Sequence, residues 1–128
     1  MLPPTGPIPV VIIAPPGRLR DALSVLLRAD NRIALVGQAD DLAAGLEMVA
    51  ARAPALMVLN VGEGGDTILA GLCQLKAQNP QVRFVALVRD RDQQQLARIA
   101  GADAVSVDGF RSEMLFEMPT ISLKEQPK

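Results

Sequence analysis

The 128-residue chain contains no histidine, no tyrosine and no tryptophan, and its single cysteine is Cys73. The absence of histidine removes the commonest general acid–base side chain at neutral pH and the commonest protein metal ligand. A lone cysteine forms no internal disulfide and no thiolate cluster, which is typical of a reducing cytoplasm. Aromatic residues make up only 2% of the chain, so single-stranded nucleic acid would find almost no side chains on which its bases could stack. These absences favour a non-enzymatic protein without a cofactor.

Charge and hydropathy exclude further classes of protein. Thirteen Lys and Arg residues stand against fourteen Asp and Glu residues, and the basic residues are scattered along the chain rather than clustered as in nucleic-acid binders. No apolar run approaches the ~20 residues of a membrane span. The segment from Met1 to Pro7 has no basic side chain, so it does not resemble a signal peptide. We therefore expect a cytoplasmic protein that contacts neither nucleic acid nor membrane.

The length fits one domain of ordinary size. Residues 1–8 contain Pro3, Pro4 and Pro7 and are predicted to form an extended leader. The domain is expected over residues 9–118, and residues 119–128 form a C-terminal tail.

Within the domain, short apolar runs alternate with longer segments of helical period. Strands are predicted at 9–14, 33–36, 56–60, 84–88 and 104–107. Helices are predicted to begin near Gly17, at Asp40–Asp41, near Thr67, near Asp90 or Asp92, and near Ser112, and the first is expected to face inward with Leu19, Leu23, Leu26 and Leu27. Fully apolar strands joined by helices indicate an α/β fold with a doubly wound, five-stranded parallel sheet and helices on both faces.

A glycine-rich stretch, Gly62-Glu63-Gly64-Gly65-Asp66-Thr67, follows the third predicted strand. It lacks the Lys-Ser/Thr ending of a Walker motif and the glycine spacing of a dinucleotide fingerprint. It is therefore interpreted as a flexible turn, with Asp66 or Thr67 as the N-cap of a helix over about 67–77.

The order of these elements carries a resemblance to a known family. Asp40-Asp41 opens a helix after Val36-Gly37, a strand ends at Asn60, and Gly101-Ala102-Asp103 precedes the last strand. Together these features resemble the receiver domains of response regulators, the flavodoxin-like modules of two-component phosphorelay signal transduction. The resemblance covers about Pro9 to Met118.

The resemblance also implies where a phosphorylation site would lie, and this chain departs from the family there. Receivers hold magnesium with two adjacent carboxylates after the first strand and with the aspartate that is phosphorylated, because magnesium prefers carboxylate oxygens. An amide is a far poorer nucleophile than an ionised carboxylate. In this chain Ala14 and Pro15 match the acidic pair, and Asn60 matches the acceptor aspartate. Ala86 matches the hydroxyl residue, Asp108 matches the lysine, and Val105 matches the switch aromatic. The sequence therefore predicts a degenerate pseudo-receiver with no catalytic residue and no magnesium or other metal.

The C-terminal stretch is unusually apolar. It contains more large apolar side chains than a two-turn surface helix buries, so it either folds back on the sheet or is covered by a second chain. Receivers commonly pair through the fourth helix, the fifth strand and the fifth helix, and the resemblance therefore favours a homodimer. The interface candidates are Phe110, Leu115, Phe116 and Met118.

Three hypotheses for function follow. The first is a phosphorylation-independent module that binds a protein partner or a second copy of itself. The second is a small-molecule sensor or enzyme fragment that uses the crevice at the strand ends, with Asn60, Glu63 and Asp108 as polar groups. The third is a regulatory segment of a longer protein, such as a helix-turn-helix DNA-binding regulator or a pilus-assembly ATPase. Closure of the crevice by Pro15 and Leu87 would favour the first over the second.

Overall fold

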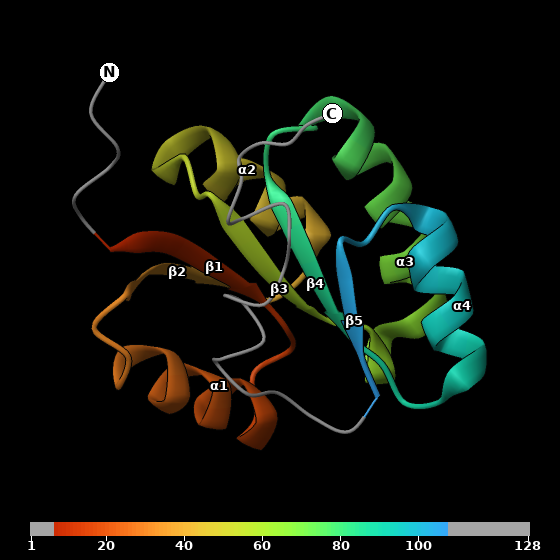
Figure 1. Cartoon of the computed structure of the whole chain (residues 1–128), viewed down its shortest axis with the longest axis horizontal. Helices are drawn as coiled ribbons and strands as arrows, with labels where there is room; N and C mark the ends of the chain where they lie inside the picture. The colour runs from red at the N-terminus through yellow and green to blue at the C-terminus, as the bar shows by residue number, and fades with distance from the viewer. Residues whose placement is uncertain (1–6, 108–128) are drawn as a thin grey trace.

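The computed structural model describes residues 7–107, except for the side chains of residues 63–66. Strands and helices alternate along this part of the chain (Figure 1). Their order is β1 (Ile8–Ile13), α1 (Arg18–Arg28), β2 (Ile33–Ala39), α2 (Leu42–Arg52), β3 (Leu56–Asn60), α3 (Val61–Gln78), β4 (Arg83–Leu87), α4 (Arg91–Ala100) and β5 (Ala104–Ser106). The five predicted strands and the first four predicted helices are confirmed, and the helix predicted near Ser112 lies outside the described residues.

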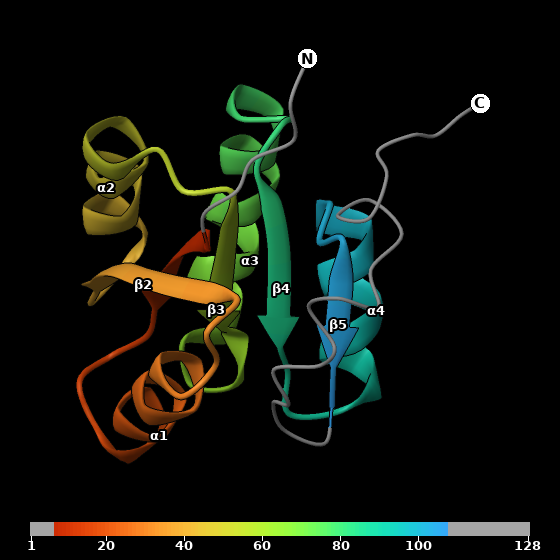
Figure 2. The ribbon, with the colours of Figure 1, turned by 60° about the vertical axis from the view of Figure 1, so that its left-hand side comes forward.

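All described strands are parallel and form one sheet in the order β2-β1-β3-β4-β5. In Figure 2 the sheet separates α1 from α2, α3 and α4. Because each parallel neighbour is reached by a crossover, the connecting helices are placed on the two faces of the sheet. This is the predicted doubly wound, flavodoxin-like α/β architecture.

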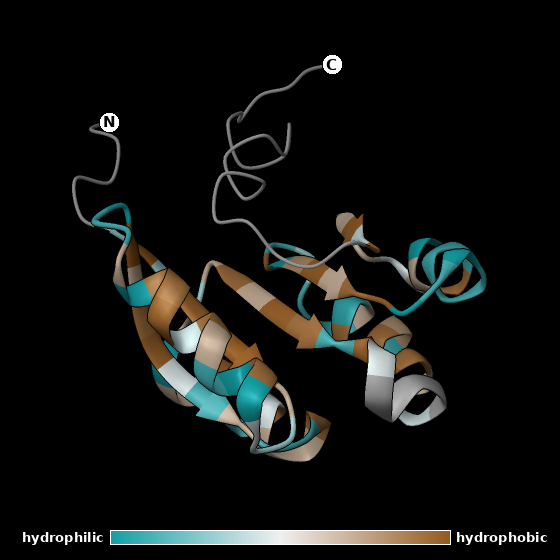
Figure 3. Ribbon diagram, turned by 90° about the horizontal axis from the view of Figure 1, so that it is seen from below, coloured by the Kyte–Doolittle hydropathy of each residue, from teal (hydrophilic) through white to brown (hydrophobic). Residues whose placement is uncertain are grey.

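Each face of the sheet has its own apolar core, which explains why the strands are apolar at nearly every position (Figure 3). On one face Ile13 and Leu59 of the strands pack with Leu72 of α3. On the other face Ile12 and Val58 pack with Leu23 and Leu27 of α1. The remaining inward leucines predicted for α1, Leu19 and Leu26, are exposed. Among the described strands α1 packs mainly on β1 and β2, and Leu23 and Leu27, one turn apart, suffice for that contact.

The second strand is longer than predicted and continues through Gly37 to Ala39. Val10 pairs with Leu35 whereas Val11 pairs with Gly37, so Val36 is the extra residue of a β-bulge. A Cβ on Gly37 would collide with the sulfur of Met48 in α2. The glycine therefore marks the close approach of a helix to the strand, and not the end of the strand.

Three predicted helix boundaries are confirmed by their caps. The side chains of Asp41 and Asp90 accept hydrogen bonds from the backbone N–H groups of Ala44 and Gln93, both at 2.9 Å. Gly101 ends α4 in the left-handed conformation, with φ of 112°. None of the helices within residues 7–107 combines the length and apolar character needed to cross a bilayer.

Candidate functional site

The carboxyl ends of the parallel strands lie at one edge of the sheet, where ligands of open α/β sheets bind. Ile13 pairs with Leu59, so the next residue, Ala14, lies level with Asn60. Asn60 in turn pairs with Leu87, and Leu87 pairs with Ser106. The structure therefore brings Ala14 and Asn60, two of the positions predicted from the resemblance, to one level of this edge.

A guanidinium group lies over the end of β1, at the position predicted for the degenerate acidic pair. Ala14 is fully buried, and its carbonyl oxygen accepts a hydrogen bond from Nη1 of Arg20 at 3.3 Å. The same Arg20 nitrogen forms an ion pair with Asp40, which follows β2, while Pro15 is half-buried. Arg20 therefore engages both the Ala14 carbonyl oxygen and the Asp40 carboxylate, the two oxygen groups nearest to this position that a cation could use.

Asn60, the predicted degenerate acceptor, is the N-cap of α3. Its side-chain Oδ1 accepts the backbone N–H of Gly62 at 3.1 Å, and the residue is only 3% exposed. The helix begins at Val61, so the prediction of a turn over 62–67 with Asp66 or Thr67 as the N-cap was wrong. An asparagine cap satisfies one of the free N–H groups of the first turn, and the helix can therefore begin at the strand end despite its glycines.

Arg89 connects the first turn of α3 to the start of α4. Its Nη1 donates to the carbonyl oxygen of Gly62 at 3.1 Å, and its Nε lies 3.4 Å from Oδ2 of Asp90. The backbone N–H of Arg89 donates to Oε1 of Gln93 at 2.8 Å, while the N–H of Gln93 donates to Asp90. The hydrogen bond from the Gln93 N–H lowers the pKa of Asp90 below its usual 3.8, and Arg89 lowers it further.

Ala86 and Val105 lie level with Leu59, one residue before Asn60 in the strand register. Ala86 pairs with Leu59 on one side and with Val105 on the other, and Ala86 is fully buried in the core. The last residue of β4, opposite Asn60, is Leu87. Asp108, the position that matches the family lysine, and the interface candidates Phe110, Leu115, Phe116 and Met118 lie outside the described residues.

The described residues of this edge do not fit a magnesium ion. Such an ion needs several hard oxygen ligands, usually including carboxylates. Here Ala14 and Pro15 supply no side-chain oxygen, Oδ1 of Asn60 is bonded to the Gly62 N–H, and the nearby carboxylate of Asp40 is paired with Arg20. Elsewhere in the described part of the chain, no three His, Cys, Asp or Glu side chains gather as a metal site would require.

Sequence reasoning missed the two arginines at this edge. Arg20 lies six residues after Ala14, and Arg89 lies 27 residues after Gly62, so neither contact follows a local spacing rule. The one available signal was position: Arg89 follows the apolar run of β4 directly, where side chains reach the edge of the sheet. What this edge offers chemically is hydrogen bonding from guanidinium groups to backbone carbonyls, which connects the segments that follow the strand ends.

The sequence matches no protein-family model and no curated protein. The structure is similar to the signal receiver domain of the response regulator NarL from Mycobacterium tuberculosis, with a TM-score of 0.73 and 21% identity over 88% of this chain and 93% of that chain. It is also similar to the response regulator domain of Thermotoga maritima CheB, with a TM-score of 0.72 and 15% identity over 88% and 93% of the two chains.

A third similar structure is the RcsB response regulator of Salmonella typhimurium, with a TM-score of 0.70 and 11% identity. The match covers 80% of this chain but only 52% of the RcsB chain, so this protein spans about half of that regulator. Identities this low show the fold alone. The chain has the fold of a response-regulator receiver domain.

Proposed function

We propose that this chain is a phosphorylation-independent signalling module with the receiver fold, and that it acts by binding protein. The observation that carries this proposal is the state of Asn60. The acceptor position holds an amide that is buried, and its oxygen is engaged in capping α3. An amide in this position has neither the negative charge nor the free lone pairs that attack on a phosphoryl donor requires.

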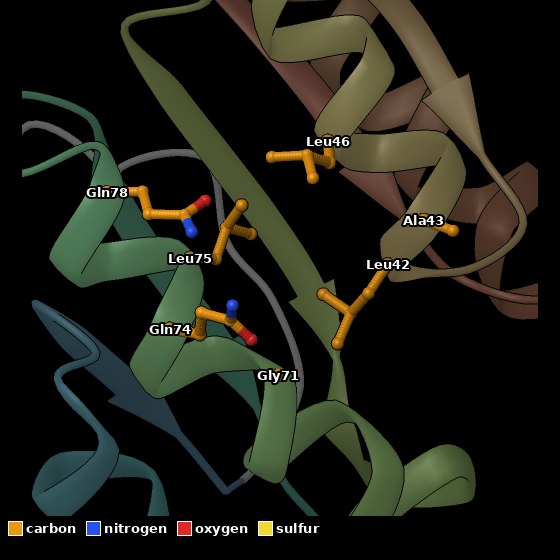
Figure 4. Close-up of a pocket in the computed structure, with 7 residues that line it drawn as sticks. All are labelled: Leu42, Ala43, Leu46, Gly71, Gln74, Leu75 and Gln78. Carbon is orange, nitrogen blue, oxygen red and sulfur yellow. The ribbon is translucent and has the colours of Figure 1, made fainter.

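The surroundings of Asn60 support the same proposal. Leu87, opposite Asn60, is 5% exposed, and Arg20 lies over the end of β1. One hollow among the described residues lies elsewhere, between α2 and α3 (Figure 4). A small-molecule sensor would need an open, polar crevice at the strand ends. Among the described residues of this edge, Ala14 and Leu87 are buried and the amide oxygen of Asn60 is bonded to the Gly62 N–H, which favours an interaction module over a sensor.

Exposed apolar side chains support the proposal that the domain acts by binding a protein partner through its surface. Val25 on α1 and Leu96 and Ile99 on α4 are all exposed, and Ile99 is 75% exposed. The same role would suit the regulatory segment of a longer regulator, as the RcsB chain extends well beyond the matched part. In that setting a partner or a second copy would bind the surface of the domain whether or not a phosphoryl donor is present.

Incubation with acetyl phosphate and magnesium, followed by intact-mass measurement, tests the proposal. We expect no mass gain of one phosphoryl group, whereas a receiver that retains the acidic pair and the acceptor aspartate gains it under the same conditions. A stable phosphoryl adduct on residue 60 would overturn phosphorylation independence.

The homodimer expected from the C-terminal stretch belongs to this proposal, although its residues lie outside the described part. Truncating a large apolar side chain at an interface centre often costs ~2 kcal/mol or more. Phe116→Ala should therefore shift the species seen by light scattering toward monomer with an unchanged circular dichroism spectrum. A wild-type chain that is monomeric at high concentration would refute the homodimer.

A further inference from the structure

The strand β2 lies at one edge of the sheet, so among the described residues it has a hydrogen-bonded neighbour, β1, on one side only. It runs over seven residues, Ile33–Ala39, and contains neither a charged side chain nor a proline. Proteins usually protect an edge strand from pairing with another chain by keeping it short or by placing charges or proline on it. These protections are absent along β2.

Two hydrogen bonds show which peptide groups of β2 face β1. The carbonyl oxygen of Arg32 accepts the N–H of Ile8 at 2.8 Å, and the carbonyl oxygen of Ala39 accepts the N–H of Ala14 at 3.0 Å. In a parallel ladder every second residue directs its N–H and carbonyl groups toward a given neighbour, and the residues between direct theirs away. Arg32 and Ala39 are separated by an odd number of positions, so this alternation is interrupted once between them.

The interruption is the β-bulge, in which Val36 is the extra residue. Before the bulge the peptide groups of Ile33 and Leu35 point away from β1, and after it those of Gln38 and Asp40 do so. Among the described residues, the backbone groups of Leu35 and Gln38 form no hydrogen bond beyond those of the sheet. These two residues therefore present N–H and carbonyl groups along the open edge.

The bulge makes the open edge complementary to itself. The outward positions 33, 35, 38 and 40 are spaced by two, three and two residues, and the spacing is the same when the strand is reversed. The edge of β2 therefore matches a second β2 that runs antiparallel to it, with Leu35 opposite Gln38 and Gln38 opposite Leu35. A regular strand has a spacing of two throughout, so it pairs with only one side of the bulge. The irregularity that hinders other strands thus fits a second copy of this chain.

The charges at the two ends of β2 favour the same partner. In the antiparallel register Arg32, before the strand, lies opposite Asp41, after the strand, of the other copy, whereas a parallel register would oppose like charges. Arg32 contacts Asp30 in its own chain and Asp41 accepts the N–H of Ala44, yet both side chains remain at the surface. Charges in such positions set the orientation and register of an interface more than its affinity.

We propose that two copies of this chain pair antiparallel through the outer edges of β2, which joins their five-stranded sheets into one continuous sheet. Leu35 of each copy exchanges both backbone hydrogen bonds with Gln38 of the other. The interface is isologous, since the same residues contribute from both copies. The inference rests on the proposed function, because it names a surface through which the domain binds protein, and it uses none of the C-terminal interface candidates.

Amide hydrogen exchange of the full chain over a range of concentrations tests the proposal. We expect the N–H groups of Leu35 and Gln38 to exchange rapidly in dilute solution and slowly in concentrated solution. The N–H of Ile12, buried in the same sheet, should exchange slowly in both. A nuclear Overhauser cross-peak between the N–H protons of Leu35 and Gln38 should appear together with the protection. Residues three apart in one strand are separated by about 10 Å, so this cross-peak joins two chains.

Gln38→Pro tests the edge directly. It removes the outward N–H and places a ring on the edge, while it removes no hydrogen bond to β1. Sedimentation equilibrium should show a dimer weakened by about 30-fold or more, because two backbone hydrogen bonds are lost per dimer. Gln38→Thr is the matched control, since it keeps the N–H and suits a strand, and it should leave the dimer intact. If Gln38→Pro unfolds the domain, the exchange of the wild-type chain decides.

Rapid exchange of the Leu35 and Gln38 N–H groups at millimolar concentration would overturn the pairing. Slow exchange that does not depend on concentration would also overturn it, because the edge would then be covered within one chain. So would a dimer that persists in Gln38→Pro and is lost in Phe116→Ala. The proposed function fails by a different result, a phosphoryl adduct on residue 60, and a chain without this adduct whose β2 edge stays unpaired would refute the pairing alone.

Discussion

The ammonium Nζ of Lys76 lies 2.9 Å from Oδ2 of Asp103, which ties α3 to the loop before β5. The same carboxylate oxygen accepts the backbone N–H of Phe84 at 2.8 Å, so Asp103 also holds the start of β4. Lys76 donates to the carbonyl oxygen of Val82 at 2.8 Å and stands 5.4 Å from the ring centroid of Phe84. The Gly101-Ala102-Asp103 motif thus joins three elements through one side chain.

Asp103→Ala should lower the free energy of unfolding by about 2 kcal/mol, because a partly buried ammonium loses its carboxylate partner and a strand N–H loses its acceptor. Asp103→Asn should cost less, since its amide oxygen still accepts the Phe84 N–H. Urea denaturation measures both. Asp40→Ala is the matched control, because Asp40 is exposed and exposed ion pairs contribute about 0–1 kcal/mol. An equal loss in Asp40→Ala and Asp103→Ala would contradict this account.

Gly45→Ala should destabilise the domain although alanine is the better helix former. The gain in helix propensity is about 1 kcal/mol, whereas overpacking a core costs about 1–3 kcal/mol. The new Cβ would collide with Cδ1 of Ile13 and lie 2.9 Å from its Cγ1, and Ile13 is fully buried. Thermal unfolding should therefore show a lower Tm for Gly45→Ala.

Gly37→Ala provides the comparison for that prediction. Its Cβ meets the sulfur of Met48, a flexible and partly exposed side chain that can change rotamer. The Tm of Gly37→Ala should fall less than that of Gly45→Ala. The reverse order would show that Met48 is more tightly held than Ile13.

The sheet and most helix ends could be predicted because they depend on local signals. The central strands β1, β3 and β4 are largely buried on both faces and read as continuous apolar runs. The aspartates that cap α2 and α4 precede the first turn of each helix. The exposure of Leu19 and Leu26 in α1 could not be predicted. The four leucines of α1 lie on adjacent faces of the helix, and their spacing in the sequence is the same whether one or both of these faces contact the sheet.

The start of α3 could not be predicted because local propensity and tertiary structure disagree there. Three glycines within the first turns disfavour a helix by roughly 1 kcal/mol each. The cap from Asn60 and the bond from Arg89 to the Gly62 carbonyl favour it, and the second of these joins residues distant in sequence. The level of Ala86 relative to Asn60 likewise depends on strand register, which sequence does not specify to one residue.

Acidification should weaken the N-terminus of α4 through Asp90. Its pKa is lowered in the folded state, first by the hydrogen bond from the Gln93 N–H and also by Arg89. A lowered folded pKa means that protons bind the unfolded state more tightly, so the contribution of Asp90 is fully present above its usual value of 3.8 and is lost as the pH falls through the folded pKa.

Asp90→Asn isolates this effect, because asparagine caps a helix without titrating. Between neutral pH and the acid range below the folded pKa of Asp90, the wild-type chain should lose more free energy of unfolding than Asp90→Asn loses. Urea denaturation at a series of pH values gives the comparison. If the free energy of unfolding of the two proteins changed equally with pH, Asp90 would bind protons equally well in the folded and unfolded states, which would contradict this prediction.

Asn60→Asp should restore the acceptor side chain without restoring a receiver response. The carboxylate can still cap α3, so the variant should fold, whereas Asn60→Ala should lose the cap and about 1 kcal/mol of stability. The end of β1 still offers Ala14 and Pro15 with the Arg20 guanidinium beside them, so magnesium gains at most one carboxylate ligand. Addition of magnesium and beryllofluoride should leave the amide spectrum of Asn60→Asp unchanged. Saturable shifts around β1 and β3 would mean that the remaining residues of this edge suffice for a phosphoryl analogue, and that the substitution at position 60 alone explains the missing chemistry.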